Sequence, residues 1–176
     1  MIVFNSDKII KAFNCIDFKD LNLYLHGIYI KYNKEDKSVI YVGSNGSMLY
    51  KGKEVIEDNE EFYSYFSDGK IIWFDKDDIK SIKLHHGWLV DSEGWKFSID
   101  KREVKMDYPD FDSVINNCLH DDFNEKERDY YFSYRNIKIF EDNFKDYHLK
   151  YKCGITYVFN DNDDVLLMMK SIKFNK

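Results

Sequence analysis

Three successive stretches of this chain carry the same predicted order of elements, and that order limits the folds open to it. In each stretch the apolar pattern predicts a short strand, then a helix, then about three strands. The helices are predicted to begin at Ser6 or Asp7, at Asp75 and at Ser133, whose side chains can cap a first turn, and the first helix to continue to about residue 19. The positions expected to face inward are Ile9, Ile10, Phe13, Ile16, Ile79, Ile82, Ile137, Phe140 and Phe144.

The strands of the three stretches are predicted from apolar residues bounded by turn residues. Their ranges are 1–4, 24–32, 39–43 and 48–55, then 71–74, 84–90, 95–100 and 103–106, then 130–132, 147–151, 155–159 and 165–172. Of the 176 residues 44% are hydrophobic and 18% aromatic, and flat side chains suit the half-buried surface of a sheet. The sequence therefore predicts an α+β protein with a mostly β core, as one compact unit or two small ones.

The cysteines and the N-terminus predict a reduced, cytoplasmic protein. Cys15, Cys118 and Cys153 lie far apart without a Cys-x-x-Cys spacing, which indicates packed thiols and not a zinc site or a disulfide framework. Residues 1–5 carry no charged leader, and no segment approaches the roughly 20 apolar residues of a membrane span. We expect no signal peptide and no membrane contact.

Four separated segments, taken in order, are similar to those of a known family. They are residues 25–30 (Leu-His-Gly-Ile-Tyr-Ile), 42–49 (Val-Gly-Ser-Asn-Gly-Ser-Met-Leu), 108–111 (Tyr-Pro-Asp-Phe, with Val114 and Ile115 following) and 165–172 (Val-Leu-Leu-Met-Met-Lys-Ser-Ile). The series resembles the bacterial and phage DNA sliding clamps, the β subunits of DNA polymerase III. There a Leu-Asn-Gly-Val/Ile strand precedes Ala-Thr-Asp-Gly-His-Arg-Leu, then Phe-Pro-Asp-Tyr, then Val-Met-Pro-Met-Arg. The resemblance covers nearly the whole chain.

The resemblance implies a clamp architecture, with antiparallel sheets outside and helices on one face around a hole for duplex DNA. The family builds each domain from two strand-helix-strand units, so three units amount to about one and a half domains. Residues 1–116 are then one domain, and residues 117–176 are a third unit that packs into the same globule or pairs with another subunit. The implied role is a shortened processivity factor for DNA replication, of phage or cellular origin, which rings DNA as a homo-oligomer and tethers a DNA polymerase.

A clamp also needs cations on the helix faces that turn away from the sheet. Lys and Arg share such faces on all three predicted helices, and the DNA-facing candidates are Lys8, Lys11, Lys76, Lys80, Lys83, Arg135 and Lys138. Because the net charge is −6, contacts with phosphate would be local and salt-sensitive, without base reading. The alternative is that these are ordinary solvated helix faces.

The resemblance further implies an apolar pocket that holds short motifs of a polymerase, with a clamp loader as a further candidate partner. The matching residues are Ser44, Gly46, Ser47, Met48, Leu49, Pro109, Val114, Leu167, Met168 and Met169. Methionine adapts to varied apolar anchors, although the last three would serve equally well in a buried strand. The loop at 44–48 and the strand at 165–172 depart from the family pattern, the latter by lacking its proline and arginine, so partner specificity stays open.

Enzyme chemistry finds little support in the sequence. His85 and His86 are adjacent on a predicted strand and point to opposite faces, and the acidic run at 161–164 fits a polar turn without the glycine and glutamate of a calcium loop. We expect no catalytic, metal or cofactor site. The other hypotheses are a clamp-fold interaction module that binds host replication proteins as a decoy or inhibitor without encircling DNA, and an unrelated β-rich protein.

Overall fold

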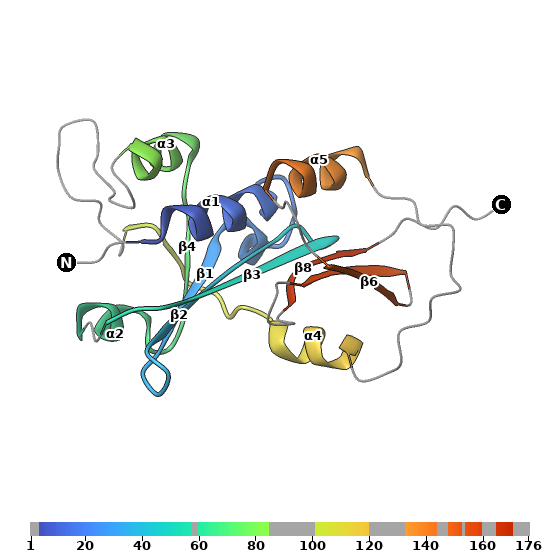
Figure 1. Ribbon diagram of the computed structural model, residues 1–176. Coiled ribbons are helices and arrows are strands. Elements are labelled where there is room, and N and C mark those ends of the chain that lie inside the picture. The colour runs from blue at the N-terminus through green and yellow to red at the C-terminus, as the bar shows by residue number, and fades with distance from the viewer. Residues whose placement is uncertain are drawn as a thin grey trace.

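A computed structural model of this chain describes residues 4–57, 60–84, 101–119, 133–143, 148–152, 154–159 and 165–170. The strands of these residues form one antiparallel sheet in the order β5-β4-β1-β2-β3-β8-β7-β6 (Figure 1). The pairing of β3 with β8, which sets Leu49 opposite Met168, joins the N-terminal strands to the C-terminal ones. The bounds are β1 (Ile28–Asn33), β2 (Ser38–Ser44), β3 (Met48–Val55), β4 (Lys70–Ile72), β5 (Glu103–Val104), β6 (His148–Lys152), β7 (Ile155–Phe159) and β8 (Val165–Lys170).

The helices form a layer on each side of this sheet. In Figure 1, α1, α3 and α5 lie on one side and α4 lies on the other. Helix α2 is placed at one end of the sheet, where Phe62 and Phe66 join the core beneath α1. The bounds are α1 (Ser6–Cys15), the 3-10 helix η1 (Leu23–His26), α2 (Glu60–Phe66), α3 (Lys76–Leu84), α4 (Phe111–Leu119) and α5 (Tyr134–Asn143).

Alternation of side chains along the strands separates two cores, one on each face. On β2, Val39 and Tyr41 are buried in the larger core on the α1 side, whereas Val42 is buried in the smaller core on the α4 side. The buried members of the smaller core are Val42, Phe111, Ile115, Tyr157, Phe159 and Met168. Each face of the sheet is therefore closed by its own helix layer.

Helix α1 lies directly on β2 because Gly43 has no side chain. A Cβ at Gly43 would come within 2.1 Å of the carbonyl oxygen of Ala12 and within 2.9 Å of its Cα. These are backbone atoms of the helix, which cannot move aside as a flexible side chain would. Ile9 and Ala12, which face the strands here, are fully buried.

A polar network fixes the start of α1 to the same strands. Asn5 donates from Nδ2 to Glu54 of β3 at 2.6 Å, and the Tyr41 hydroxyl donates to the other oxygen of that carboxylate at 2.6 Å. Burial, with the Glu54 charge as a second cause, raises the pKa of Tyr41 well above its usual value. Tyr41 therefore stays a neutral donor.

Both ends of α1 differ from the sequence prediction. The N-cap is Asn5, not Ser6 or Asp7, and its Oδ1 accepts a backbone N–H three residues along the chain at 3.1 Å. The helix ends at Cys15 and not near residue 19, because Ile16 has extended backbone angles. The sequence prediction missed Asn5 because Asn, Ser and Asp are nearly equivalent as N-cap residues, so Ser6 and Asp7 were equally good candidates.

Asp75 and Ser133 cap α3 and α5 as predicted. The Asp75 carboxylate accepts two backbone N–H groups of the first turn at 2.8 Å each, and the Ser133 hydroxyl accepts the N–H of Asn136 at 3.2 Å. The inward face of α5 agrees with the prediction at Phe140, which packs against the larger core, but not at Ile137, which is 38% exposed while Asn136 is buried. Asn136 hydrogen-bonds the turn before β3, a contact that an apolar pattern cannot show.

Other differences concern short elements. Helices α2 and α4 are absent from the prediction, and η1 takes the first part of the strand expected at 24–32. The strands expected at 71–74 and 103–106 are shorter, as β4 and β5. The strands expected at 95–100 and 130–132, nearly all of 84–90, His85, His86 and the acidic run at 161–164 lie outside the described residues.

The Gly43 contact makes a direct prediction. Gly43→Ala should lower the free energy of unfolding by about 1–3 kcal/mol, because the new methyl group forces α1 away from β2. Urea denaturation measures this loss. Lys31→Ala, at an exposed position of β1, is the control and should change stability by less than about 0.5 kcal/mol. Equal stability of both variants would contradict the close contact.

Candidate functional site

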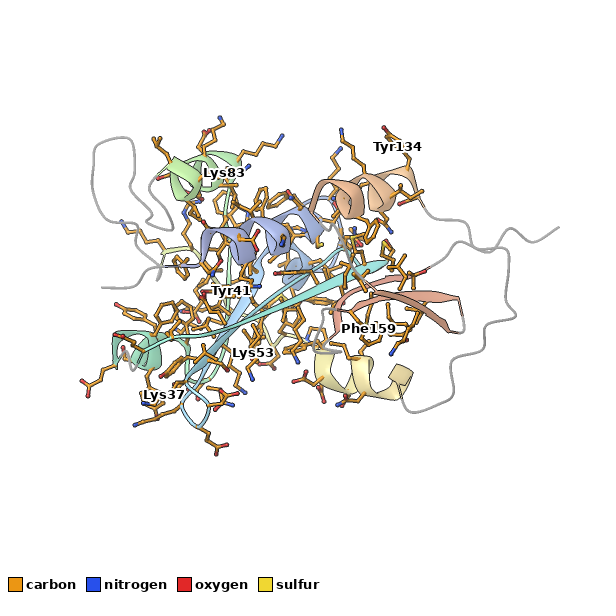
Figure 2. All side chains as sticks on the ribbon, viewed as in Figure 1. Lys37, Tyr41, Lys53, Lys83, Tyr134 and Phe159 are labelled. Atoms are coloured by element: carbon orange, nitrogen blue, oxygen red, sulfur yellow. The ribbon has the colours of Figure 1, made fainter. Side chains whose placement is uncertain are left out.

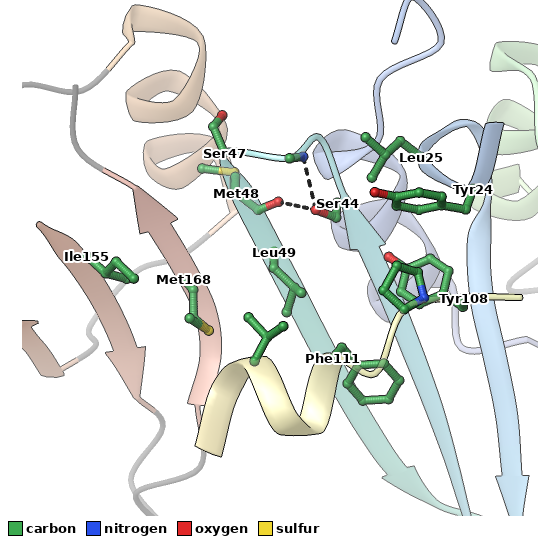
Figure 3. Close-up of a pocket in the computed structure, with 13 residues that line it drawn as sticks. Tyr24, Leu25, Ser44, Ser47, Met48, Leu49, Tyr108, Phe111, Ile155 and Met168 are labelled. Atoms are coloured by element: carbon green, nitrogen blue, oxygen red, sulfur yellow. Dashed lines mark hydrogen bonds between the residues drawn. The ribbon is translucent and has the colours of Figure 1, made fainter. Parts of the chain in front are cut away.

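A pocket of about 250 Å³ lies on the α4 side of the sheet (Figure 3). Its walls come from η1, the loop between β2 and β3, the segment that leads into α4, α4 itself, β7 and β8. The lining residues are Tyr24, Leu25, Ser44, Gly46, Ser47, Met48, Leu49, Tyr108, Pro109, Phe111, Val114, Ile155 and Met168. Most of this lining is apolar, so the pocket suits apolar side chains of a ligand.

Side-chain hydrogen bonds hold the loop between β2 and β3 in place. The Ser44 hydroxyl donates to the Met48 carbonyl at 2.8 Å and accepts the Gly46 N–H at 3.1 Å (Figure 3). Asn45 Oδ1 accepts the N–H groups of Ser47 and Met48 at 3.0 and 2.8 Å. Gly46 has a φ of 78°, which favours glycine, so this tight loop depends on that residue.

Helix α4 forms the opposite wall. Asp110 begins it by accepting the Ser113 N–H at 3.0 Å, and Phe111 then anchors it in the smaller core. Lys51 of β3 contacts the helix from the sheet, with Nζ 2.6 Å from the Asp112 carboxylate and 5.3 Å from the centre of the Phe111 ring. These contacts leave Val114 47% exposed beside the pocket.

Tyr108 forms part of the wall through ring stacking and not through a hydrogen bond. Its ring lies 5.0 Å from that of Tyr29 at 27°, and 5.9 Å from that of Tyr24 at 79°. Its hydroxyl is buried and has no hydrogen-bond partner among the described residues. Burial is the main cause that raises the pKa of Tyr108, with Tyr24 and Cys15 as lesser ones.

Eight of the ten residues that the sequence assigns to a pocket line this one: Ser44, Gly46, Ser47, Met48, Leu49, Pro109, Val114 and Met168. Leu167 and Met169 do not. They are buried in the core on the α1 side, because neighbours of Met168 along a strand must point to the opposite face. Five further residues were missed: Tyr24, Leu25, Tyr108, Phe111 and Ile155. Tyr108 and Phe111 belong with Pro109 to the segment 108–111, which resembles one of the clamp segments. Their closeness to Pro109 was the signal that could have predicted them as pocket residues.

The predicted cations of α3 are exposed on the other side of the molecule. Lys76, Lys80 and Lys83 share one helix face, and Figure 2 shows Lys83 on the side away from Lys53. Lys80 pairs with Asp77 at 2.7 Å, an interaction that raises the pKa of Lys80. Lys76 and Lys83 have no ion-pair partner within the described ranges.

The two predicted cations of α1 contact neighbouring residues, whereas Lys138 of α5 does not share these contacts. The side chain of Lys8 lies against Gly52 of β3. A Cβ added at Gly52 would come within 3.0 Å of the Lys8 Cδ. Lys11 pairs with Asp7 at 3.0 Å. Lys138 is exposed.

Arg135 joins α5 to the end of α1. Its guanidinium donates to the Asp17 carboxylate at 3.0 Å and to the Ile16 carbonyl at 2.9 Å. The pKa of Asp17 is lowered, first by the N–H of Lys19 and then by Arg135. Arg135 therefore has a structural partner, which the one-dimensional pattern of charges could not reveal.

Other kinds of site are not evident in the described part of the chain. No group of three or more His, Cys, Asp or Glu side chains there could hold a metal ion. Cys15 is buried with a free thiol, whose Sγ lies 3.6 Å from Met48 Sδ, and burial raises its pKa. Cys118 and Cys153 are outside the side chains described. Among the described helices none has the length and apolar character needed to cross a membrane.

Comparison with solved structures identifies the fold. A protein assigned as a DNA polymerase III β subunit from Eubacterium rectale superposes with a TM-score of 0.64 at 12% identity, over 99% of this chain and 66% of that one. The DNA polymerase sliding clamp from Pseudomonas aeruginosa gives 0.45 at 12% identity, over 99% of this chain and 52% of that one. No family model and no curated protein matches the sequence. The chain has the α+β fold of the sliding clamps, and it spans about two thirds or half of those two structures.

Tyr108 supplies a test of this pocket wall. Tyr108→Phe should be as stable as the parent at neutral pH, or up to about 1 kcal/mol more stable, because it removes a buried hydroxyl without a partner. The pKa of Tyr108 is higher in the folded chain than the value of about 10 in the unfolded one, so stability should fall as pH rises above 10.

This alkaline loss should be smaller in Tyr108→Phe, though not abolished, because Tyr29 and Tyr41 also have raised pKa values. Urea unfolding at neutral pH and above pH 10 measures both effects. Tyr134→Phe, whose ring is 80% exposed, is the control and should behave as the parent. A Tyr108→Phe variant that loses stability at neutral pH would show that the hydroxyl has a partner.

Proposed function

We propose that this chain is a sliding-clamp-like processivity factor without enzymatic activity. It encircles duplex DNA as a homo-oligomer and holds a DNA polymerase through the pocket between α4 and the sheet. A clamp loader is a further candidate for the same pocket. Residues 1–116 and 117–176 would then correspond to one clamp domain and a third unit.

The observation that carries this proposal is the pocket. Four segments that resemble those of the clamp family, from residues 25 to 168, meet at one apolar cavity on the face opposite α1, α3 and α5. A cavity of about 250 Å³ with a methionine and aromatic lining fits a few apolar anchors of a peptide. The fold by itself does not support contact with a polymerase, whereas the apolar cavity does support it.

The opposite face supports the DNA contact. Lys76, Lys80 and Lys83 project from α3, and Lys138 is exposed on α5. On a chain with a net charge of −6, such local cations favour loose phosphate contacts over tight binding. Retention on DNA would therefore need a closed ring in addition to these contacts.

Assembly is the second requirement of the proposal. The chain spans 66% of the DNA polymerase III β subunit structure from Eubacterium rectale, so a ring of this chain would need more than one copy. Strands β5 and β6 are the edges of the described sheet and offer backbone groups for pairing between copies.

Charge reversal on α3 tests the DNA contact. The triple variant Lys76→Glu, Lys80→Glu and Lys83→Glu should leave circular plasmid roughly tenfold faster or more than the parent, because phosphate contacts become repulsive. Its solution mass, measured by light scattering, should be unchanged. Lys31→Glu, Lys34→Glu and Lys53→Glu form the matched control, which reverses three exposed cations elsewhere.

Retention on circular plasmid must also be lost when the plasmid is linearised, since a ring slides off free ends. A chain that is monomeric at every concentration, or that stays equally on linear and circular DNA, would contradict encirclement.

The pocket is tested by a charge placed beside it. Val114→Glu should shorten primer-extension products of the replicative polymerase from the same cell, because a desolvated carboxylate opposes apolar anchors. Asn116→Glu adds the same charge at an exposed position of α4 that does not line the pocket, and should behave as the parent. Primer-extension products of equal length with both variants would show that the pocket does not bind the polymerase.

A second candidate function is a clamp-fold interaction module that does not encircle DNA. The pairing of Lys11, Lys80 and Arg135 with carboxylates favours it, because these cations are partly neutralised. Such a module would lose its activity in Val114→Glu and keep it in the α3 charge-reversal variant.

A further inference from the structure

A second cavity, of about 350 Å³, lies between the end of α1, η1 and the start of α3. Its lining differs from that of the first pocket, since it combines three aromatic rings with two charged side chains. The lining residues are Phe18, His26, Trp73, Asp75 and Lys76. Only Lys76 among them belongs to the DNA-facing candidates, so the proposed clamp function does not account for this cavity.

Each ring of this cavity is held in place by a neighbour. The Arg102 guanidinium lies 4.6 Å from the centre of the Trp73 ring, and the backbone N–H of Trp73 donates to the Arg102 carbonyl at 2.9 Å. Phe18 packs on Phe13 at 5.5 Å and is 41% exposed. His26 Nε2 lies 2.7 Å from the Asp20 carbonyl oxygen, so that oxygen accepts from the ring.

The charges around the cavity leave a cation available. Asp75 is occupied, because its carboxylate accepts two N–H groups of α3 and lies 3.6 Å from Arg102. Lys76 is exposed at the rim and has no ion-pair partner in the described ranges, and Lys83 lies two turns further along the same face. A flat ligand with an anionic backbone would meet rings in the cavity and lysines beside it.

We propose that this cavity binds an unstacked base of single-stranded DNA, with the adjoining phosphates on the lysines of α3. Aromatic rings stack on any base, and cations that follow the backbone add salt-sensitive affinity without sequence preference. The inference extends the proposed DNA contact to the single strand that adjoins a duplex during replication. It concerns a different cavity from the polymerase pocket.

Fluorescence anisotropy with two labelled oligonucleotides tests the base site. One is an oligothymidylate and the other an abasic strand of equal length, which keeps the phosphates and lacks the bases. The parent chain should bind the oligothymidylate about fivefold tighter or more than the abasic strand. Phe18→Ser should lose this preference. Lys76→Gln should bind both strands more weakly and should keep the preference for the oligothymidylate.

Tyr63→Ser is the matched control, because Tyr63 is 43% exposed on α2 and lies outside the cavity. It should keep the base preference of the parent. Equal binding of the two strands by the parent, absence of binding to either, or an unchanged preference in Phe18→Ser would overturn the proposal.

Plasmid retention is measured separately, so the two proposals can fail independently. Retention without a base preference would contradict the base site alone, and a base preference without retention would contradict encirclement alone.

Discussion

The contact between Gly43 of β2 and the backbone of Ala12 in α1 is the constraint on which the rest of the fold depends. No other residue fits at position 43 while the helix stays in place, since a Cβ would lie 2.1 Å from a carbonyl oxygen. This approach buries Ile9 and Ala12 completely, on the side of the sheet where α3 and α5 also lie. Asn5, Tyr41 and Glu54 then fix the start of the helix.

Because α1 closes one face of the sheet, the other face is left to α4 and the apolar pocket. Strand alternation makes the two faces independent: Met168 lines the pocket while its neighbours Leu167 and Met169 support the core beneath α1. Exposed cations on α3 and an apolar cavity beside α4 thus lie on opposite sides of one sheet. The proposed function uses this separation, with DNA at one face and a protein at the other.

Eight residues of the pocket could be predicted, because their segments resemble those of the clamp family. The loop between β2 and β3 is also held by hydrogen bonds among its own residues, which are local in sequence. The aromatic wall was missed because Tyr24 and Tyr108 meet only after η1 and the α4 segment are packed together. The ion pair of Arg135 and the exposure of Ile137 were missed for the same reason, as Asp17 and the turn before β3 are far from α5 in sequence.

By itself, the sequence determined strands β1, β2, β3, β6, β7 and β8, the caps at Asp75 and Ser133, and the order of segments that resembles a clamp. These depend on neighbouring residues and on the periods of the helix and the strand. Only the tertiary structure decided which face of β8 reaches the pocket, which cations are paired, and that Phe18, His26 and Trp73 surround one cavity. Those outcomes depend on contacts between residues distant in the chain, whose geometry is set by packing.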